Sequence, residues 1–202
     1  LALAKNLMIV THAYKEIGFA AKNTFPGMEI LGKTLGIIGV GHIGSRVAKM
    51  GLGLGMKVLA YDPYVSSVPE GVVLCTDKAD VVRQADVLTL HPVLNEETRN
   101  IIGPKELAMM KPTAYFINCG RGPLVDEPAL IEALQNKKIA GAGLDVTWSE
   151  PCEPDSPLFQ MENVILTPHY APTTRESAMN VSKAAAQNIL DVLSSKKPEG
   201  LL

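Results

Sequence analysis

The chain has 202 residues, a formal net charge of −2 and 47% hydrophobic residues. This length is enough for one large or two small domains with a buried core. The near-neutral charge argues against a dedicated nucleic-acid-binding protein, which carries a basic patch. No apolar stretch reaches the roughly 20 residues that a membrane span needs. The three cysteines are odd in number and widely spaced, which favours a reducing cytoplasmic location, and the histidines lack metal-ligand spacing, so no metal site is expected.

Apolar residues recur at helical spacing from Leu1 to about Lys22, which predicts a leading amphipathic helix. The Asn23–Lys33 stretch, with its proline and glycines, is expected to be a loop. After it, short apolar runs alternate with helical patterns. The runs typical of buried strands are Thr34–Gly39, Val58–Tyr61, Val72–Leu74, Val87–Leu90, Ala114–Asn118, Ala140–Asp145 and Val164–Thr167. The helical patterns are His42–Leu54, Ala79–Arg83, Pro104–Lys111, Glu127–Lys137 and Thr174–Ser194.

Continuous apolar strands that alternate with helices are typical of a parallel sheet covered on both faces. We therefore expect an α/β fold with a doubly wound, mostly parallel sheet of the Rossmann type. The expected helix ends agree with this interpretation. Asp126 is expected to cap one helix, and the four residues from Thr173 to Glu176 have the pattern of a capping box before another.

A glycine run, G-x-G-x-x-G, lies between the first predicted strand and the helix His42–Leu54. In this position Gly39 permits a tight turn, Gly41 lets the backbone approach a pyrophosphate, and Gly44 lets the helix pack closely on the strand. The helix N-terminus offers unpaired N–H groups to the phosphates. The run alone is a weak signal, but its place between strand and helix predicts a dinucleotide site.

Asp62 follows the second predicted strand, about 20 residues after the glycine run. An acid at this place accepts hydrogen bonds from the ribose hydroxyls of the adenosine and repels a 2′-phosphate. No arginine follows it in the sequence Asp62-Pro63-Tyr64. The sequence therefore predicts NAD rather than NADP as the cofactor.

Three ionisable residues come just after three other predicted strands: Arg121, Glu150 and His169. Ligands of doubly wound sheets bind beyond the carboxyl ends of the strands. An arginine suits a carboxylate or ketone oxygen, a histidine can exchange a proton with a substrate oxygen, and a glutamate beside it would orient the imidazole. Spacing alone leaves a structural alternative open, in which Arg121 forms a loop salt bridge, Glu150 is a solvated rim residue and His169 ends a buried strand.

Several motifs resemble those of the D-isomer-specific 2-hydroxyacid dehydrogenases, and the resemblance covers nearly the whole chain. It rests on Leu31 to Gly39 with the glycine loop, Asn118-Cys119-Gly120-Arg121-Gly122 with Val125-Asp126-Glu127, Gly143-Leu144-Asp145-Val146 leading to Glu150-Pro151, and Thr167-Pro168-His169 leading to Thr174 and Glu176. The resemblance implies that Arg121 binds substrate, that Glu150 is the acid partner and that His169 is the proton donor.

The resemblance also implies cofactor contacts. On the adenosine side they are His42, Ile43 and Asp62, and on the nicotinamide side Cys119, Gly120, Arg121 and Asp145. Two segments that border the nicotinamide depart from the family pattern. The family has His-x-Pro where this chain has His91-Pro92-Val93, and small residues with a glycine where it has Tyr170-Ala171-Pro172. We also expect His91, Pro92 and His169 to contact the cofactor.

The resemblance implies that a substrate lobe, built mainly from preceding chain, is largely absent. We expect an NAD-binding domain over residues 1–188, whose leading helix is 1–22, and a segment over 189–202 that returns toward that lobe. The expected function is interconversion of a small 2-keto acid and a D-2-hydroxy acid, with a chain that is inactive or weakly active by itself. A homodimer through the leading helix is expected.

Alternative interpretations are an NAD(H)-sensing corepressor-like binding protein and, ranked lower, a formate dehydrogenase-like enzyme, which would have Gln in place of Glu150. Trp148 is interpreted as a contact to substrate or to a second subunit, or as a residue without a function. The 3-phosphoglycerate, glyoxylate or hydroxypyruvate, and lactate branches of the family are not distinguished, because they differ mainly in residues of the other lobe.

Overall fold

The structure is a computed structural model that describes residues 1–198, and it divides the chain into two compact units, Leu1–Pro168 and His169–Leu202. The first unit is built on a seven-stranded sheet in the order β3-β2-β1-β4-β5-β6-β7, in which every pairing is parallel. The strands are β1 (Thr34–Ile38), β2 (Lys57–Tyr61), β3 (Val72–Leu74), β4 (Val87–Leu90), β5 (Tyr115–Asn118), β6 (Gly141–Leu144) and β7 (Val164–Leu166). The expected α/β class, its Rossmann topology and the positions of all seven strands are confirmed.

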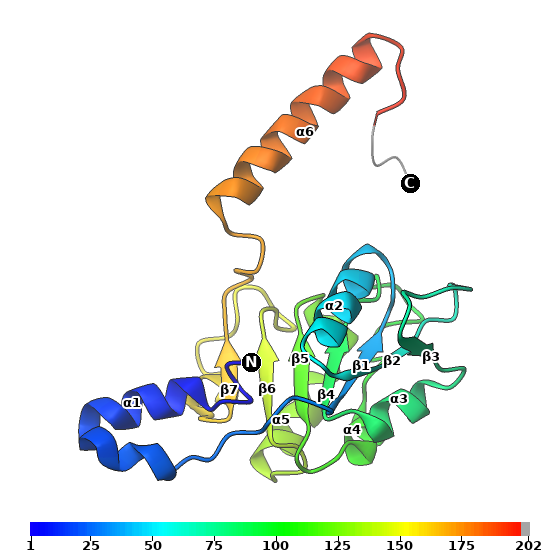
Figure 1. Cartoon of the computed structure of the whole chain (residues 1–202). Helices are drawn as coiled ribbons and strands as arrows, with labels where there is room; N and C mark the ends of the chain where they lie inside the picture. The colour runs from blue at the N-terminus through cyan, green and yellow to red at the C-terminus, as the bar shows by residue number, and fades with distance from the viewer. Residues whose placement is uncertain (199–202) are drawn as a thin grey trace. The chain divides into compact units, whose positions relative to one another are not determined.

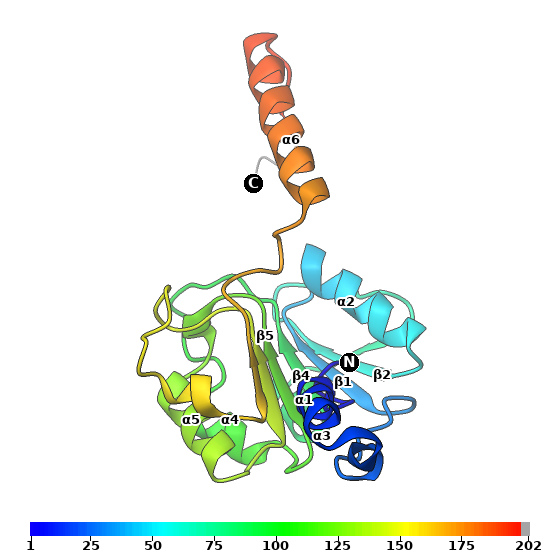
Figure 2. The same cartoon turned by 90° about the vertical axis from the view of Figure 1, so that its left-hand side faces the viewer.

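Helices cover both faces of this sheet. They are α2 (His42–Gly53), α3 (Lys78–Gln84), α4 (Pro104–Met109) and α5 (Glu127–Gln135). Figure 2 shows α2 on one side of the sheet and α4 and α5 on the other. Two buried clusters correspond to these layers: the larger lies under α3, α4 and α5 around Phe116, and the smaller lies under α2 around Ile37. The two layers hold the strands in one frame, from which the loops of the site extend.

The leading helix is shorter than expected. The structure has α1 over Leu7–Ile17 and a 3-10 helix, η1, over Gly18–Asn23, while residues 2–6 form turns (Figure 1). The prediction of one helix from Leu1 is wrong because Asn6 adopts the left-handed conformation, at φ 50°, and its side-chain amide donates to the Pro26 carbonyl at 3.1 Å. Gly18, at φ 61°, ends the helix at the other side.

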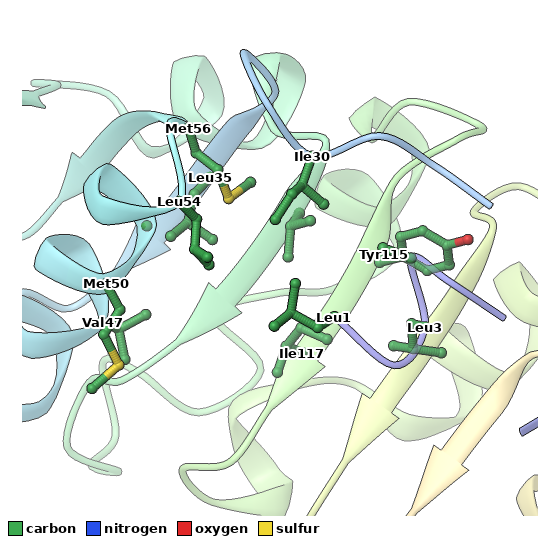
Figure 3. Close-up of a pocket in the computed structure, with 13 residues that line it drawn as sticks. Leu1, Leu3, Ile30, Leu35, Val47, Met50, Leu54, Met56, Tyr115 and Ile117 are labelled. Atoms are coloured by element: carbon green, nitrogen blue, oxygen red, sulfur yellow. The ribbon is translucent and has the colours of Figure 1, made fainter. Parts of the chain in front are cut away.

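An apolar cavity of about 180 Å³ lies on the α2 face of the sheet. Figure 3 shows Leu1 and Leu3 beside Ile117 and Tyr115 of β5, with Val47 and Met50 of α2 across the space. Its lining consists of apolar residues, with Tyr115 as the exception. The cavity therefore offers few groups to a charged dinucleotide and is distinct from the strand ends described below.

The second unit contains α6 (Arg175–Leu193). Its N-cap is Thr174, whose hydroxyl accepts from the Ser177 N–H at 2.9 Å. The expected capping box began at Thr173, one residue before the N-cap of the structure. The predicted segment 189–202 includes the end of α6, and its last four residues lie outside the described part of the chain. Within residues 1–198, no helix is both long and apolar enough to cross a membrane.

A part-buried carboxylate, Asp86, joins the starts of β1 and β4. It accepts from the Thr34 N–H at 2.8 Å and pairs with the Lys111 ammonium at 2.9 Å. Burial by itself would raise the pKa of Asp86, but these hydrogen bonds and the lysine charge outweigh burial and lower the pKa below its usual value. Asp86 therefore stabilises the fold above about pH 4, and this contribution is lost as the pH falls through the folded-state pKa.

Replacement of Asp86 by asparagine is expected to lower the free energy of unfolding by about 1–3 kcal/mol at pH 7. Urea denaturation at pH 7 and at pH 3 measures this difference, which should shrink at the lower pH. The matched control is Asp80→Asn, which removes an exposed pair with Arg83 and should cost less than about 1 kcal/mol. An Asp86→Asn effect of equal size at both pH values would contradict the assignment.

Candidate dinucleotide site

The register of the sheet aligns the carboxyl ends of β1, β2, β4, β5 and β6 along one edge of the sheet. Ile38 pairs with both Tyr61 and Leu90, and Asn118 pairs with both Leu90 and Leu144. The residues that follow these ends begin loops on the same edge of the sheet; they are Gly39, Asp62, His91, Cys119 and Asp145. Five residues predicted from separate motifs are therefore brought together along this edge, where doubly wound sheets bind their ligands.

The glycine run has the backbone that its position requires. Gly39 adopts φ 88°, a conformation that L side chains rarely take, and a Cβ on it would lie 2.5 Å from the Pro92 nitrogen. A Cβ on Gly44 would lie 2.1 Å from the Gly39 carbonyl oxygen. The tight turn and the close contact of α2 with the strand are both present.

Gly41 differs from the other two glycines because a Cβ on it would meet nothing within 4 Å. It is the N-cap of α2, and no side chain caps this helix end. The next two residues, His42 and Ile43, are exposed. The N–H groups of this first turn lack intrahelical acceptors and carry a partial positive charge, so the open space beside Gly41 fits a pyrophosphate.

Asp62 links the glycine loop to the end of β2. One carboxylate oxygen accepts from the Val40 N–H at 2.8 Å, and the other accepts from the Tyr64 N–H at 3.0 Å. Each carboxylate oxygen can accept more than one hydrogen bond. The two backbone bonds thus fix the carboxylate beside the glycine loop and leave it able to accept from ribose hydroxyls.

The loop after β4 lies against the glycine run through its backbone at His91 and Pro92. The His91 ring is hydrogen-bonded to the Thr89 hydroxyl at 3.0 Å, and burial lowers the pKa of His91 below its ordinary value. His91 is therefore mostly neutral at pH 7. The change from the family's His-x-Pro pattern leaves Val93 exposed in this loop.

The loop that carries Arg121 is braced by the fully buried side chain of Asn118. The Asn118 amide group donates to the Arg121 carbonyl at 2.9 Å and accepts from the Gly120 N–H at 3.0 Å. Arg121 itself is exposed, and its guanidinium donates to the Gly120 carbonyl at 2.7 Å. Burial, followed by the charge of Asp145, raises the pKa of the Cys119 thiol, which is therefore a neutral thiol at pH 7.

The loop after β6 meets the Arg121 loop directly. A Cβ on Gly122 would lie 1.8 Å from the Thr147 carbonyl oxygen, so the two loops are in backbone contact. Asp145 is buried and accepts from the Thr167 hydroxyl at 2.6 Å. Glu150 is exposed at the end of this loop, before a cis bond to Pro151. The first unit thus presents Arg121 and Glu150 on two loops that touch.

His169 is the first residue of the second unit and adopts the left-handed conformation, at φ 52°. Such a backbone costs about 1–3 kcal/mol in a non-glycine residue and occurs often at functional sites. A direct role of His169 beside Arg121 and Glu150 stays a prediction.

Trp148 lies on the same loop as Glu150. Its backbone N–H donates to the Glu127 carboxylate at 2.8 Å, and the Arg99 guanidinium lies 5.7 Å from the ring centroid. The sequence singled out Trp148 but gave no sign of these two partners. The tryptophan is therefore held in place on the protein, and a contact to substrate or to a second subunit stays a prediction.

Gly41→Ala is expected to weaken NADH binding at least about tenfold while the fold is retained, because the added methyl group occupies the space beside the helix N-terminus. An alanine N-cap should change the free energy of unfolding by about 1 kcal/mol at most. Fluorescence titration with NADH and thermal unfolding measure the two effects. Gly44→Ala is the contrasting variant, since it should lose both stability and binding. Wild-type affinity in Gly41→Ala would contradict the placement of the pyrophosphate.

Residues 1–171 match the family model described as D-isomer specific 2-hydroxyacid dehydrogenase, NAD binding domain. The chain is 42% identical to D-3-phosphoglycerate dehydrogenase of Methanocaldococcus jannaschii, over 100% of this chain and 39% of the relative. It is 41% identical to glyoxylate reductase of Aeropyrum pernix, over 87% of this chain and 53% of the relative. The chain therefore spans between about two fifths and about half of the length of these relatives.

Solved structures give the same result. D-lactate dehydrogenase with NAD+ from Lactobacillus jensenii superposes with a TM-score of 0.88 at 35% identity, over 100% of this chain and 64% of that one. The NAD-complexed D-isomer specific 2-hydroxyacid dehydrogenase of Lactobacillus delbrueckii ssp. bulgaricus has a TM-score of 0.85 at 36% identity, over 100% of this chain and 66% of that one. Together with the glycine turn and the Asp62 carboxylate, these matches show that the chain belongs to the D-isomer specific 2-hydroxyacid dehydrogenase family, as its NAD binding domain.

Proposed function

We propose that the protein is an NAD-dependent oxidoreductase that interconverts a 2-keto acid and a D-2-hydroxy acid. The observation that carries the proposal is the juxtaposition of a dinucleotide cradle with the Arg121 and Glu150 loops on one sheet edge. Family membership supports the reaction class. The names of relatives, which include phosphoglycerate, glyoxylate and lactate enzymes, support a small carboxylic acid as substrate.

In this proposal, the glycine loop and Asp62 would hold NAD, which would supply the hydride chemistry at the substrate carbon. The Arg121 guanidinium binds the carboxylate and the carbonyl oxygen of the 2-keto acid, for which its planar donors are suited. His169 gives a proton to the oxygen that becomes the hydroxyl, and takes it back in the reverse direction. Glu150 orients the imidazole and favours its protonated form.

We propose further that the cofactor is NAD rather than NADP. The Asp62 carboxylate is fixed by the Val40 and Tyr64 N–H groups at the expected ribose position. A 2′-phosphate there would meet a negative charge, so NADH should bind more tightly than NADPH. A comparison of the two dissociation constants tests this preference.

The 202-residue chain by itself is expected to bind NADH with little or no turnover, because relatives carry further sequence and closure of two lobes completes a site of this kind. The test is NADH titration followed by a panel of 2-keto acids, including glyoxylate, hydroxypyruvate and pyruvate. NADH binding with slow turnover supports the proposal. Rapid NADH oxidation by the isolated chain would refute the expected inactivity, and absence of NADH binding would refute the proposed function.

A homodimer is also proposed, through α1 and η1. None of the α1 residues is buried, and Leu7, Met8, Tyr14 and Ile17 are exposed large hydrophobic side chains, as is Phe19 of η1. Exposed apolar patches of this kind mark interaction sites, and closed two-fold dimers are the commonest oligomers. Sedimentation equilibrium should give twice the chain mass of 21.6 kDa, and a monomer at micromolar concentration would contradict the proposal.

A further inference from the structure

A side-chain bridge joins two loops that border the dinucleotide site. The Tyr64 hydroxyl donates to the Glu97 carboxylate, although 33 residues separate them. Tyr64 follows β2 and Glu97 follows β4, and these strands flank β1, which carries the glycine run. The bridge therefore spans the cofactor edge from one side of the glycine run to the other.

Both ends of the bridge are anchored. At one end the Tyr64 N–H donates to Asp62, whose second oxygen accepts from the Val40 N–H. At the other end the buried Thr98, next to Glu97, donates to the Val93 carbonyl at 2.6 Å and accepts from the Asn95 N–H at 2.8 Å. The tyrosine ring is thus fixed through its backbone and through its hydroxyl.

The ring is also accessible, because 74% of Tyr64 is exposed. A large aromatic side chain fixed at both ends but exposed on its face contributes little to the core, so a structural role alone does not account for it. Aromatic faces stack on nucleobases. Replacement of such an aromatic side chain by alanine weakens nucleotide binding about 5- to 150-fold. The hydrogen bond to Glu97, followed by its charge, raises the pKa of Tyr64, so the phenol remains a donor.

We propose that Tyr64 is a stacking platform for the adenine base and that Glu97 is a positioning residue that holds its ring in place. This inference rests on the proposed function, because it takes Asp62 as the ribose ligand. The base is joined directly to that ribose, so it must lie beside Asp62, next to the residue whose N–H already binds the Asp62 carboxylate. Glu97 acts only through the tyrosine hydroxyl, which donates a charge-assisted hydrogen bond to its carboxylate.

The test measures dissociation constants for NADH, for ADP-ribose and for reduced nicotinamide mononucleotide, which lacks adenosine. Tyr64→Ala should weaken the binding of NADH and of ADP-ribose by the same factor, about 5- to 150-fold, and leave the affinity for the mononucleotide unchanged. Tyr64→Phe keeps the ring and should recover most of this loss. Glu97→Ala should have the same small effect as Tyr64→Phe, and the double variant should be no weaker than either single variant.

Phe159→Ala is the matched control, since it removes another exposed aromatic ring from the 3-10 helix η3 (Pro157–Gln160), which precedes β7. It should leave all three constants unchanged, and thermal unfolding checks that each variant is folded. Wild-type protein that does not bind NADH refutes the proposed function itself. If the wild-type protein binds NADH and Tyr64→Ala binds ADP-ribose as tightly as the wild type does, the platform is refuted but the proposed function is not. The same holds if Tyr64→Ala weakens binding of the mononucleotide as much as binding of NADH.

Discussion

Replacing Gly122 by alanine is expected to lower the free energy of unfolding by about 3 kcal/mol or more. The added Cβ would lie 1.8 Å from the Thr147 carbonyl oxygen and 2.7 Å from the Trp148 nitrogen. Both are backbone atoms, so no side-chain rotation relieves the contact. At about 2–4 °C for each kcal/mol in a chain of this length, the melting temperature should fall by about 6–12 °C.

The same substitution separates the loops that carry the proposed substrate-binding residues. Arg121 immediately precedes Gly122, and Glu150 follows Thr147 on the opposing loop. A displacement of about 1 Å in such groups can reduce turnover about 100-fold. Calorimetry and denaturant unfolding measure the stability loss. Gly53→Ala is the control, because a Cβ there meets nothing within 4 Å. A Gly122→Ala variant with the wild-type melting temperature would show that the loops are not in this contact.

His169→Gln should lower kcat about 100- to 10,000-fold in a form of the protein that turns over a 2-keto acid, because it removes the group proposed to supply the proton. NADH affinity should change far less, since the dinucleotide is bound mainly by the glycine loop and Asp62. Steady-state kinetics and NADH titration separate the two effects. His12→Gln, an exposed position on α1, should retain wild-type turnover.

Glu150→Gln complements this variant. It preserves the size of the side chain and removes the charge that favours the protonated imidazole, so turnover should weaken where the imidazole must be charged. The pH dependence of kcat reports this pairing. A pH–rate profile identical to the wild type would refute the role of Glu150, and full turnover by His169→Gln would refute that of His169.

The sheet and the glycine loop were predictable because their signals are local. Each strand is a short run of branched apolar residues, and Gly39 and Gly44 occupy positions where any side chain would collide with backbone. The leading helix was predicted too long because its hydrophobic spacing gives no sign of the left-handed turn at Asn6, which depends on a contact 20 residues away.

The contacts that shape the site were not predictable in the same way. Asn118 was expected as the end of a strand and as the first residue of a family motif, but neither expectation shows that its amide turns back to the next loop. The Arg99–Trp148 and Tyr64–Glu97 contacts each join loops far apart in sequence, so they arise only when the sheet has set the spacing of its strand ends. Of the predicted catalytic residues, Arg121 and Glu150 lie on touching loops, and the place of His169 beside them stays a prediction.

The Asn118 brace has a consequence for the thermodynamics of recognition. The loop from Gly120 to Arg121 is held by hydrogen bonds to this buried amide, which belong to the protein itself. A ligand that binds a loop already ordered does not have to supply the conformational entropy of ordering it, about 1–2 kcal/mol per residue. Association should then be limited by diffusion and desolvation rather than by rearrangement of this loop, and the Gly120 amide should resist hydrogen exchange before cofactor arrives.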